Sequence, residues 1–329
     1  MYTKGKVVCI VLMLMFVFTL GAEGDIKYAS GSTVEKIYER IRQAGPVYDW
    51  TEETVSFQNE GMNMVCTLVV PQTEERPPIV ITMNGFAEDR FYKEVPGTDG
   101  EWYYPRLSRI LAEQGFATLR IDYRGSGDSD GDYPMTTFST QISDAVAAAN
   151  FVRTHLRYRV KPWSLGLLGH SQGGLVASVA STLIPRVESV CIWSAVASPP
   201  ITYAGLITMD SIRQGVALPD GGNLQVSIQV GDYYYGEITL GKGFFQDLFQ
   251  VDPVAHIRDY QGPLMYVGGL KDIIVWPQPT PGQMFMDNHN GFEKLVMLNG
   301  DHEFDSDFGY EIYDECLYWT AAWFIKTLE

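Results

Sequence analysis

Short, nearly unbroken apolar runs recur along this chain, and stretches with the periodicity of amphipathic helices separate them. Residues 79–83 (Ile-Val-Ile-Thr-Met) and 117–121 (Ala-Thr-Leu-Arg-Ile) are typical of strands buried on both faces. Between them, residues 104–114 have helical spacing and end at Gly115. The same reasoning predicts strands at 164–168, 190–194, 264–267 and 295–298, and helices at 139–155, 174–184 and 310–328.

A predicted antiparallel pair precedes these elements. Residues 53–58 and 64–70 flank Asn59-Glu60-Gly61, a sequence typical of a hairpin turn. Because the later strands alternate with helices, they are expected to form a parallel sheet that is covered on both faces. The sequence therefore predicts an α/β fold with a mostly parallel eight-stranded sheet and helices on both sides.

One segment breaks this alternation after the sixth predicted strand. Residues 196–262 replace the expected short connection and are rich in Gly, Tyr and Phe. We interpret this segment as a cap or lid subdomain inserted over the active face. Residues 25–195 and 263–329 then form the core domain.

The N-terminal segment has a different pattern. Lys4 and Lys6 precede an apolar run at residues 7–20, and residues 22–24 (Ala-Glu-Gly) resemble a cleavage site. The run is shorter than the roughly 20 apolar residues of a membrane span. The pattern predicts a signal peptide over residues 1–24, a secreted or periplasmic protein, and no stable membrane anchor after cleavage.

Composition and charge narrow the function classes. The 329-residue chain is 46% hydrophobic and 19% charged, as expected of a globular protein. Its net charge of −16 argues against nucleic-acid binding, which needs a basic patch. No Cys/His spacing is typical of a metal site, and the acidic residues 128–132 are interpreted as a solvated loop rather than a calcium site. We expect a small-molecule substrate, with no metal or cofactor.

The most informative motif is the run Gly-His-Ser-Gln-Gly-Gly at residues 169–174. It fits Gly-x-Ser-x-Gly and lies between a predicted strand and a predicted helix. In that context the pattern is typical of a sharp turn that exposes a serine nucleophile above the end of a sheet. The alternative is a glycine-rich turn whose serine only caps the helix. We predict that Ser171 is the nucleophile.

A serine nucleophile needs a general base, and the base needs an acid that orients it. His302 follows the last predicted strand and lies at the same sheet edge as Ser171, so we predict that it is the base. The other four histidines are expected to pack under the turn, at helix ends or on the surface: His170, His155, His256 and His289.

Asp272 follows the penultimate strand and completes the chain order Ser, Asp, His. We predict that it is the acid; Asp301 and Asp305 are the rivals, although residues so near His302 in sequence rarely orient an imidazole well. The oxyanion is expected to bind the backbone N–H groups of Gln172 and Phe86.

These motifs resemble the α/β-hydrolase superfamily over residues 50–329. Residues 84–86 (Asn-Gly-Phe) and 122–129 (Asp-Tyr-Arg-Gly-Ser-Gly-Asp-Ser) extend the match, and the chain is most similar to bacterial cinnamoyl and feruloyl esterases. The resemblance implies a serine carboxylesterase that forms an acyl-enzyme from short-chain or aromatic acyl esters. Asn84 stands where that family has histidine, so a different support of the oxyanion loop is expected.

In that family the cap determines the substrate. Phe86, Tyr234 and Phe244 are predicted to line the acyl pocket, and a hydrophobic core within the cap is the alternative for the cap aromatics. A second hypothesis is a serine peptidase or aminopeptidase of the same fold, in which Glu88-Asp89 would bind a substrate amine. A non-catalytic binding protein is disfavoured, because the complete triad is present.

Overall fold

The computed structural model describes residues 27–28 and 47–328 of the chain. The expected signal peptide at residues 1–24 lies outside the described residues. Within the described ranges, no helix has both the length and the apolar character needed to cross a membrane.

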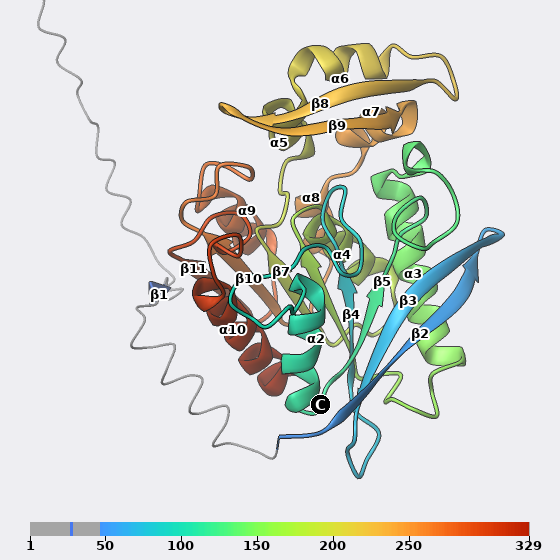
Figure 1. Cartoon of the computed structure of the whole chain (residues 1–329), viewed down its shortest axis with the longest axis vertical. Helices are drawn as coiled ribbons and strands as arrows, with labels where there is room; N and C mark the ends of the chain where they lie inside the picture. The colour runs from blue at the N-terminus through green and yellow to red at the C-terminus, as the bar shows by residue number, and fades with distance from the viewer. Residues whose placement is uncertain (1–26, 29–46, 329) are drawn as a thin grey trace, which may run out of the picture.

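A single large sheet forms the centre of the described structure (Figure 1). Its strands are β1 (Lys27–Tyr28), β2 (Trp50–Asn59), β3 (Met62–Pro71), β4 (Ile79–Met83), β5 (Ala117–Ile121), β6 (Leu165–His170), β7 (Ser189–Trp193), β10 (Leu264–Gly269) and β11 (Glu293–Leu298). Their order is β1-β11-β10-β7-β6-β4-β5-β3-β2.

The sheet is mostly parallel, as predicted. Only β2–β3 and β3–β5 pair antiparallel among these strands. β4 and β5 begin and end at the predicted residues, because each is an uninterrupted run of buried side chains. The ninth strand, β1, is a two-residue addition that pairs with β11 and was not among the eight predicted.

Helices cover both faces of the sheet, as expected for parallel strands. The buried side chains of the sheet and its helices form two hydrophobic clusters, one on each side of the sheet. One face carries α2 (Tyr103–Glu113) and α10 (Glu311–Thr327). The other carries α3 (Phe138–Thr154), α4 (Gln172–Leu183), α8 (Pro253–Ile257) and α9 (Thr280–Asn288).

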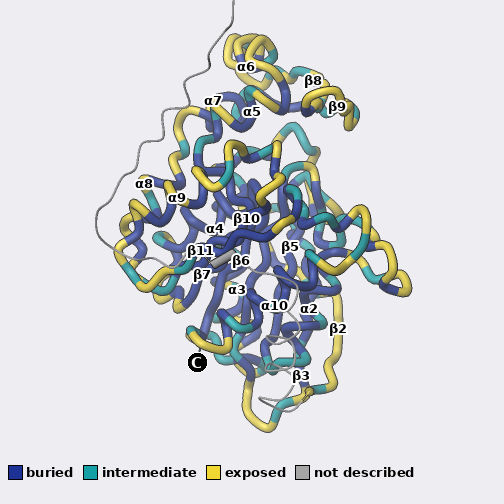
Figure 2. The backbone as a smooth tube through the Cα atoms, turned by 90° about the vertical axis from the view of Figure 1, so that its left-hand side faces the viewer, coloured by how far each residue is buried: buried dark blue, intermediate teal, exposed yellow. Residues whose placement is uncertain are grey.

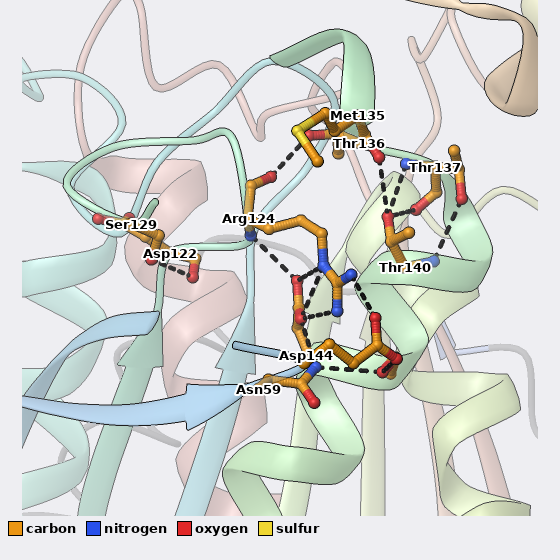
Figure 3. Close-up of polar contacts among 11 residues, drawn as sticks. Asn59, Asp122, Arg124, Ser129, Met135, Thr136, Thr137, Thr140 and Asp144 are labelled. Carbon is orange, nitrogen blue, oxygen red and sulfur yellow. Dashed lines mark hydrogen bonds and ion pairs between the residues drawn. The ribbon is translucent and has the colours of Figure 1, made fainter. Parts of the chain in front are cut away.

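A buried ion pair joins the loop after β5 to α3 (Figure 3). Asp144 accepts a hydrogen bond from the backbone N–H of Arg124 at 3.0 Å and from its guanidinium at 2.7 Å. The Asn59 amide, at the tip of the β2–β3 hairpin, also donates to Asp144 at 2.7 Å. Because Asp144 and Arg124 are buried, each charge stabilises the other. The contacts of Asp144 hold the hairpin, the loop after β5 and α3 together.

Between β7 and β10 the chain leaves the sheet. This segment contains α5 (Pro199–Ile207), α6 (Met209–Val216), the antiparallel pair β8 (Asn223–Val230) and β9 (Tyr233–Gly241), and α7 (Lys242–Gln250). These five elements lie together beyond one end of the sheet (Figure 1), and much of their surface is exposed (Figure 2).

The segment is attached to the core through α3 and returns to it at α8. Asp247 of α7 accepts a hydrogen bond at 2.6 Å from the backbone N–H of Ser139, in the first turn of α3. α8 packs against α4 and α9, among the helices that cover the sheet. The predicted segment 196–262 therefore includes α8, which packs with helices that cover the sheet.

Candidate active site

Ser171 lies at the turn between β6 and α4, in a conformation that few non-glycine residues adopt. Its φ is 54° and its ψ is −116°. Its backbone N–H donates to the carbonyl of Trp193 at 2.8 Å, and its own carbonyl accepts from Val196 at 3.2 Å. The Ser171 side chain makes no capping hydrogen bond, which argues against the helix-cap alternative.

Close packing under this turn explains why residue 173 is glycine. A Cβ atom at Gly173 would lie 2.1 Å from the carbonyl oxygen of Met83, at the end of β4, and 2.6 Å from that of Asn84. The start of α4 therefore contacts the backbone that leads into the loop after β4. This contact sets the distance between Ser171 and that loop.

His302 and Asp272 are paired, as the sequence predicted. The Nδ1–H of His302 donates to Asp272 Oδ2 at 2.8 Å, and both side chains are buried. The other carboxylate oxygen accepts the backbone N–H groups of Ile274 and Val275 at 2.8 and 2.9 Å. These hydrogen bonds fix the Asp272 carboxylate, which in turn orients the imidazole of His302. Because Nδ1 is bound to Asp272, Nε2 is the ring nitrogen that can accept a proton.

The pKa of His302 lies above its ordinary value. Burial is the largest influence and by itself lowers the pKa of the imidazole. The charge of Asp272 and its hydrogen bond act in the opposite direction, with smaller contributions from Glu303 and Glu88, and together they raise it. The site therefore stabilises the imidazolium form that proton transfer produces.

The rival acids have other roles in the loop that carries His302. Asp301 accepts the backbone N–H groups of Glu303 and Asp305, and Asp305 accepts that of Asp301 at 2.9 Å. Both carboxylates thus close the turn rather than contact the imidazole. His289, expected at the surface, is buried and lies 2.9 Å from the carbonyl oxygen of Gly262.

Ser171, Asp272 and His302 follow β6, β10 and β11, so the three loops open at one edge of the parallel sheet. His302 lies close to the nucleophile turn: its ring centroid is 5.1 Å from that of His170, the neighbour of Ser171. Among the described residues, however, no hydrogen bond joins the Ser171 hydroxyl to His302. Such contacts are often long before substrate binds.

Within the part of the chain that the structure describes, the backbone N–H groups of the two predicted oxyanion donors, Phe86 and Gln172, have no acceptor. The residues around Phe86 are held: Ala87 N–H donates to the Tyr133 hydroxyl at 2.9 Å. Asn84 donates to the carbonyl of Glu88 at 2.6 Å, so this amide closes the loop.

The side chain of Gln172 is also fixed. Its amide nitrogen donates to Gln141 of α3 at 2.6 Å, and its amide oxygen accepts from the hydroxyl of Tyr203 in α5. Gln172, a predicted oxyanion donor, is therefore held from two sides, once by a helix of the core and once by a helix of the inserted segment.

The predicted pocket residues are only partly brought together. The rings of Phe86 and Phe244 lie 5.7 Å apart and share contacts with Tyr203. Phe244 is buried, so it forms part of an aromatic cluster. Tyr234 does not join them: it lies on β9, paired with Gln229, and 62% of it is exposed. Its place in the acyl pocket was predicted from composition, which cannot determine which way a strand residue points.

Sequence reasoning missed the role of Glu88. Its carboxylate is buried and accepts hydrogen bonds from Gly85 N–H at 2.6 Å and from the Tyr104 hydroxyl at 2.5 Å. Asp89 accepts the backbone N–H groups of Phe91 and Tyr92. Glu88 is therefore buried against protein donors, and Asp89 holds its own loop through one carboxylate oxygen, Oδ1. A glutamate three residues after Gly85 was the available signal.

Acidic side chains of the loop after β5 bind other groups of the protein. Asp128 pairs with Arg90 at 2.6 Å, and Asp130 accepts the backbone N–H of Asn63 at 2.8 Å. In the described ranges, no group of three or more His, Cys, Asp or Glu side chains is arranged to hold a metal ion.

Sequence comparison relates the chain to hydrolases and to uncharacterized proteins. Residues 60–221 match the X-Pro dipeptidyl-peptidase (S15) family. A stretch of 147 residues is 27% identical to an uncharacterized 31.7 kDa protein of Escherichia coli and covers 45% of this chain and 46% of that protein. The chain thus matches about half the length of these curated relatives.

Two solved structures illustrate the similarity of fold. Est1E from Butyrivibrio proteoclasticus, solved with ferulic acid bound, has a TM-score of 0.62 at 21% identity, over 82% of this chain and 98% of that one. An acylaminoacyl peptidase from Pyrococcus horikoshii has a TM-score of 0.62 at 14% identity, over 88% of this chain and 43% of that one. At such identities the likeness is one of fold.

Proposed function

We propose that this chain, which has the α/β-hydrolase fold, is a serine hydrolase that cleaves carboxylic esters. One observation carries the proposal. A buried His302–Asp272 pair lies at the same sheet edge as Ser171, whose backbone is strained and whose side chain does not cap α4. A hydroxyl, a base and an orienting acid at one sheet edge are the parts that acyl transfer needs.

In the first half-reaction, the Ser171 oxygen attacks the carbonyl carbon of the ester while its proton passes to His302 Nε2. The former carbonyl oxygen becomes an oxyanion that accepts the free N–H groups of Phe86 and Gln172. Each such donor is expected to lower the barrier by about 3 kcal/mol. His302 then gives its proton to the leaving alcohol as the tetrahedral intermediate collapses.

The second half-reaction repeats these steps with water. His302 removes a proton from a water molecule, which attacks the carbonyl carbon of the acyl-enzyme. The oxyanion is held by the same two N–H groups, and collapse returns the proton to Ser171 and releases the carboxylic acid. Asp272 stays ionised throughout and stabilises the imidazolium in both halves.

A serine peptidase is the second candidate, and the match to the S15 family favours it. The engaged carboxylates favour the esterase. A peptidase that binds a free substrate amine needs an available acidic side chain, whereas Glu88 and Asp89 already accept protein N–H and O–H groups. Faster turnover of aminoacyl-p-nitroanilides than of p-nitrophenyl esters would contradict the esterase proposal.

For the acyl group, we propose short-chain or aromatic esters, feruloyl esters among them. The support is the aromatic surroundings of Phe86, whose ring is half-buried beside Tyr203 and Phe244. A panel of acetyl, butyryl, octanoyl and feruloyl esters tests this choice. Preference for octanoyl over both shorter and aromatic groups would exclude it.

The N-terminal pattern supports export as a further part of the proposal. Cleavage after residue 24 would release a small-molecule esterase into the periplasm or the medium. Mass spectrometry of the expressed full chain tests the cleavage site. An intact N-terminus on protein recovered from the cytoplasm would contradict it.

The nucleophile is tested with Ser171→Ala and a matched serine control. Ser178→Ala removes a buried hydroxyl from α4, the helix that follows Ser171; this hydroxyl bonds only within the helix, to the carbonyl of Gly174. The expected result is loss of p-nitrophenyl ester hydrolysis and of fluorophosphonate labelling in the first variant only. Activity that persists in Ser171→Ala would show that another residue is the nucleophile.

A further inference from the structure

A buried acid–histidine pair lies beneath the Ser171 turn and takes no part in the proton transfers described above. Glu88 comes from the loop after β4, and His170 is the last residue of β6. His170 Nδ1 lies 3.4 Å from Glu88 Oε1, and neither side chain is appreciably exposed. Burying ionisable groups is costly unless they are paired, so the arrangement needs a reason.

Glu88 is held as a carboxylate. Burial is the largest influence and raises the pKa of this carboxyl group, but His170 and the donors from Tyr104 and Gly85 outweigh it and lower the pKa. The donor from Gly85 belongs to the loop that carries Phe86. A Cβ atom at Gly85 would lie 2.5 Å from Glu88 Oε1, so glycine is needed for this contact.

His170 reaches a second loop through its other ring nitrogen. Nε2 lies 3.2 Å from the backbone carbonyl oxygen of His302, the proposed base. Both nitrogens of His170 thus face oxygen acceptors, and the Tyr104 hydroxyl gives its proton to Glu88 at 2.5 Å. A proton on Nε2 donates to the carbonyl of His302 and so holds the loop that carries the proposed base.

We propose that the Glu88–His170 pair is a positioning device for the proposed acyl transfer: it ties the oxyanion loop to the base loop through the residue that precedes the nucleophile. The inference rests on the proposed function. Glu88 holds Gly85 N–H next to the Phe86 donor, and His170 holds the main chain of His302. Ser171 follows His170 directly, so the pair connects all three parts of the site.

Two substitutions of His170 separate this role from simple packing. The amide nitrogen of Asn occupies the place of Nδ1, so His170→Asn keeps a donor to Glu88 and loses the link to His302. The amide nitrogen of Gln occupies the place of Nε2, so His170→Gln keeps the link to His302. Each variant keeps one of the two links and breaks the other, so the tie between the loops is lost in both.

The measurement is kcat and KM for a p-nitrophenyl ester, with urea unfolding of each variant beside it. His170→Asn is expected to lower kcat by about 100-fold, since displacement of catalytic groups by about 1 Å has that effect. KM is expected to change by less than about threefold, because the link acts on the transition state. His170→Gln, which breaks the link to Glu88 instead, is expected to lower kcat by a similar factor. A kcat within about threefold of the wild-type value in either variant would overturn the proposal.

A second measurement does not depend on activity or on the variants. Nitrogen-15 spectra of the histidine rings in the wild-type protein are expected to show a slowly exchanging proton on Nε2 of His170, the atom that faces the carbonyl oxygen of His302. Absence of a proton on Nε2 would overturn the proposal even if both variants failed to fold. If instead the wild type hydrolyses no ester, the proposed function fails, and these spectra still test the link between the loops.

Discussion

Replacing Asp272 by asparagine tests the proposed active site most directly. Asn keeps the size of the side chain but removes its charge, and it offers an N–H where the imidazole needs an acceptor. The change acts on the 2.8 Å hydrogen bond to His302 and leaves Ser171 and the oxyanion donors in place. The expected result is a folded protein with a severely reduced kcat.

The magnitude follows from the distance and the burial of the pair. Two unit charges 2.8 Å apart interact by about 6 kcal/mol at an effective dielectric constant of about 20. Asp272 is 1% exposed and His302 is 7% exposed, so solvent screens the pair little. Since about 1.4 kcal/mol changes a rate tenfold, loss of this stabilisation should lower kcat by about 10⁴-fold.

The pH profile should move as well, with a sign that the charges determine. His302 must be neutral to accept a proton, so activity rises as pH rises through its pKa. In the wild type the Asp272 charge raises the pKa of His302, which places the acid limb of kcat/KM above the ordinary histidine value of 6.5. Removing that charge lowers the pKa, so the limb should shift to lower pH while the plateau falls.

Asp305→Asn is the matched control. Asp305 lies three residues from His302 and accepts hydrogen bonds from the backbone of Asp301 and from Lys271, but it does not contact the imidazole. Its substitution is expected to change kcat by less than about tenfold. The reasoning fails if Asp272→Asn keeps more than about a tenth of the wild-type kcat, or if the two variants lose equal amounts.

Two further predictions concern packing around the site. Gly173→Ala places a methyl group 2.1 Å from the carbonyl oxygen of Met83, so the loop after β4 must shift. Ester kinetics should reveal a loss of about 100-fold in kcat. Gly205→Ala, where nothing lies within 4 Å, is the control and should have little effect. Asp144→Asn leaves the buried Arg124 guanidinium without its main partner; urea unfolding should reveal a loss of about 3–5 kcal/mol, and equal stability to the wild type would refute a structural role for this pair.

The sequence predicted those features that follow from local pattern. Buried runs such as 79–83 define strands by themselves, and parallel strands must end at one edge. The positions of Ser171, Asp272 and His302 directly after such runs were therefore enough to assign them to that edge. The pairing of Asp272 rather than Asp301 with the imidazole also followed from loop positions.

Other features depend on contacts between distant segments. Glu88 and His170 are 82 positions apart, and nothing local indicates that their side chains meet beneath the turn. Tyr234 was assigned to the pocket because it is aromatic, but the hairpin formed by β8 and β9 leaves it exposed. The role of the Asn84 amide likewise appears only once its loop is seen to close on Glu88.

Phe86 combines two proposed tasks, one of its backbone and one of its ring. Its backbone is a proposed oxyanion donor, while its ring packs against Tyr203 and Phe244 of the inserted segment. Selection for a new acyl group through these aromatic residues would therefore also alter turnover. Libraries that vary the segment alone should yield variants in which a change of specificity is accompanied by a lower rate, and the rate should recover only when positions in the loop after β4 vary at the same time.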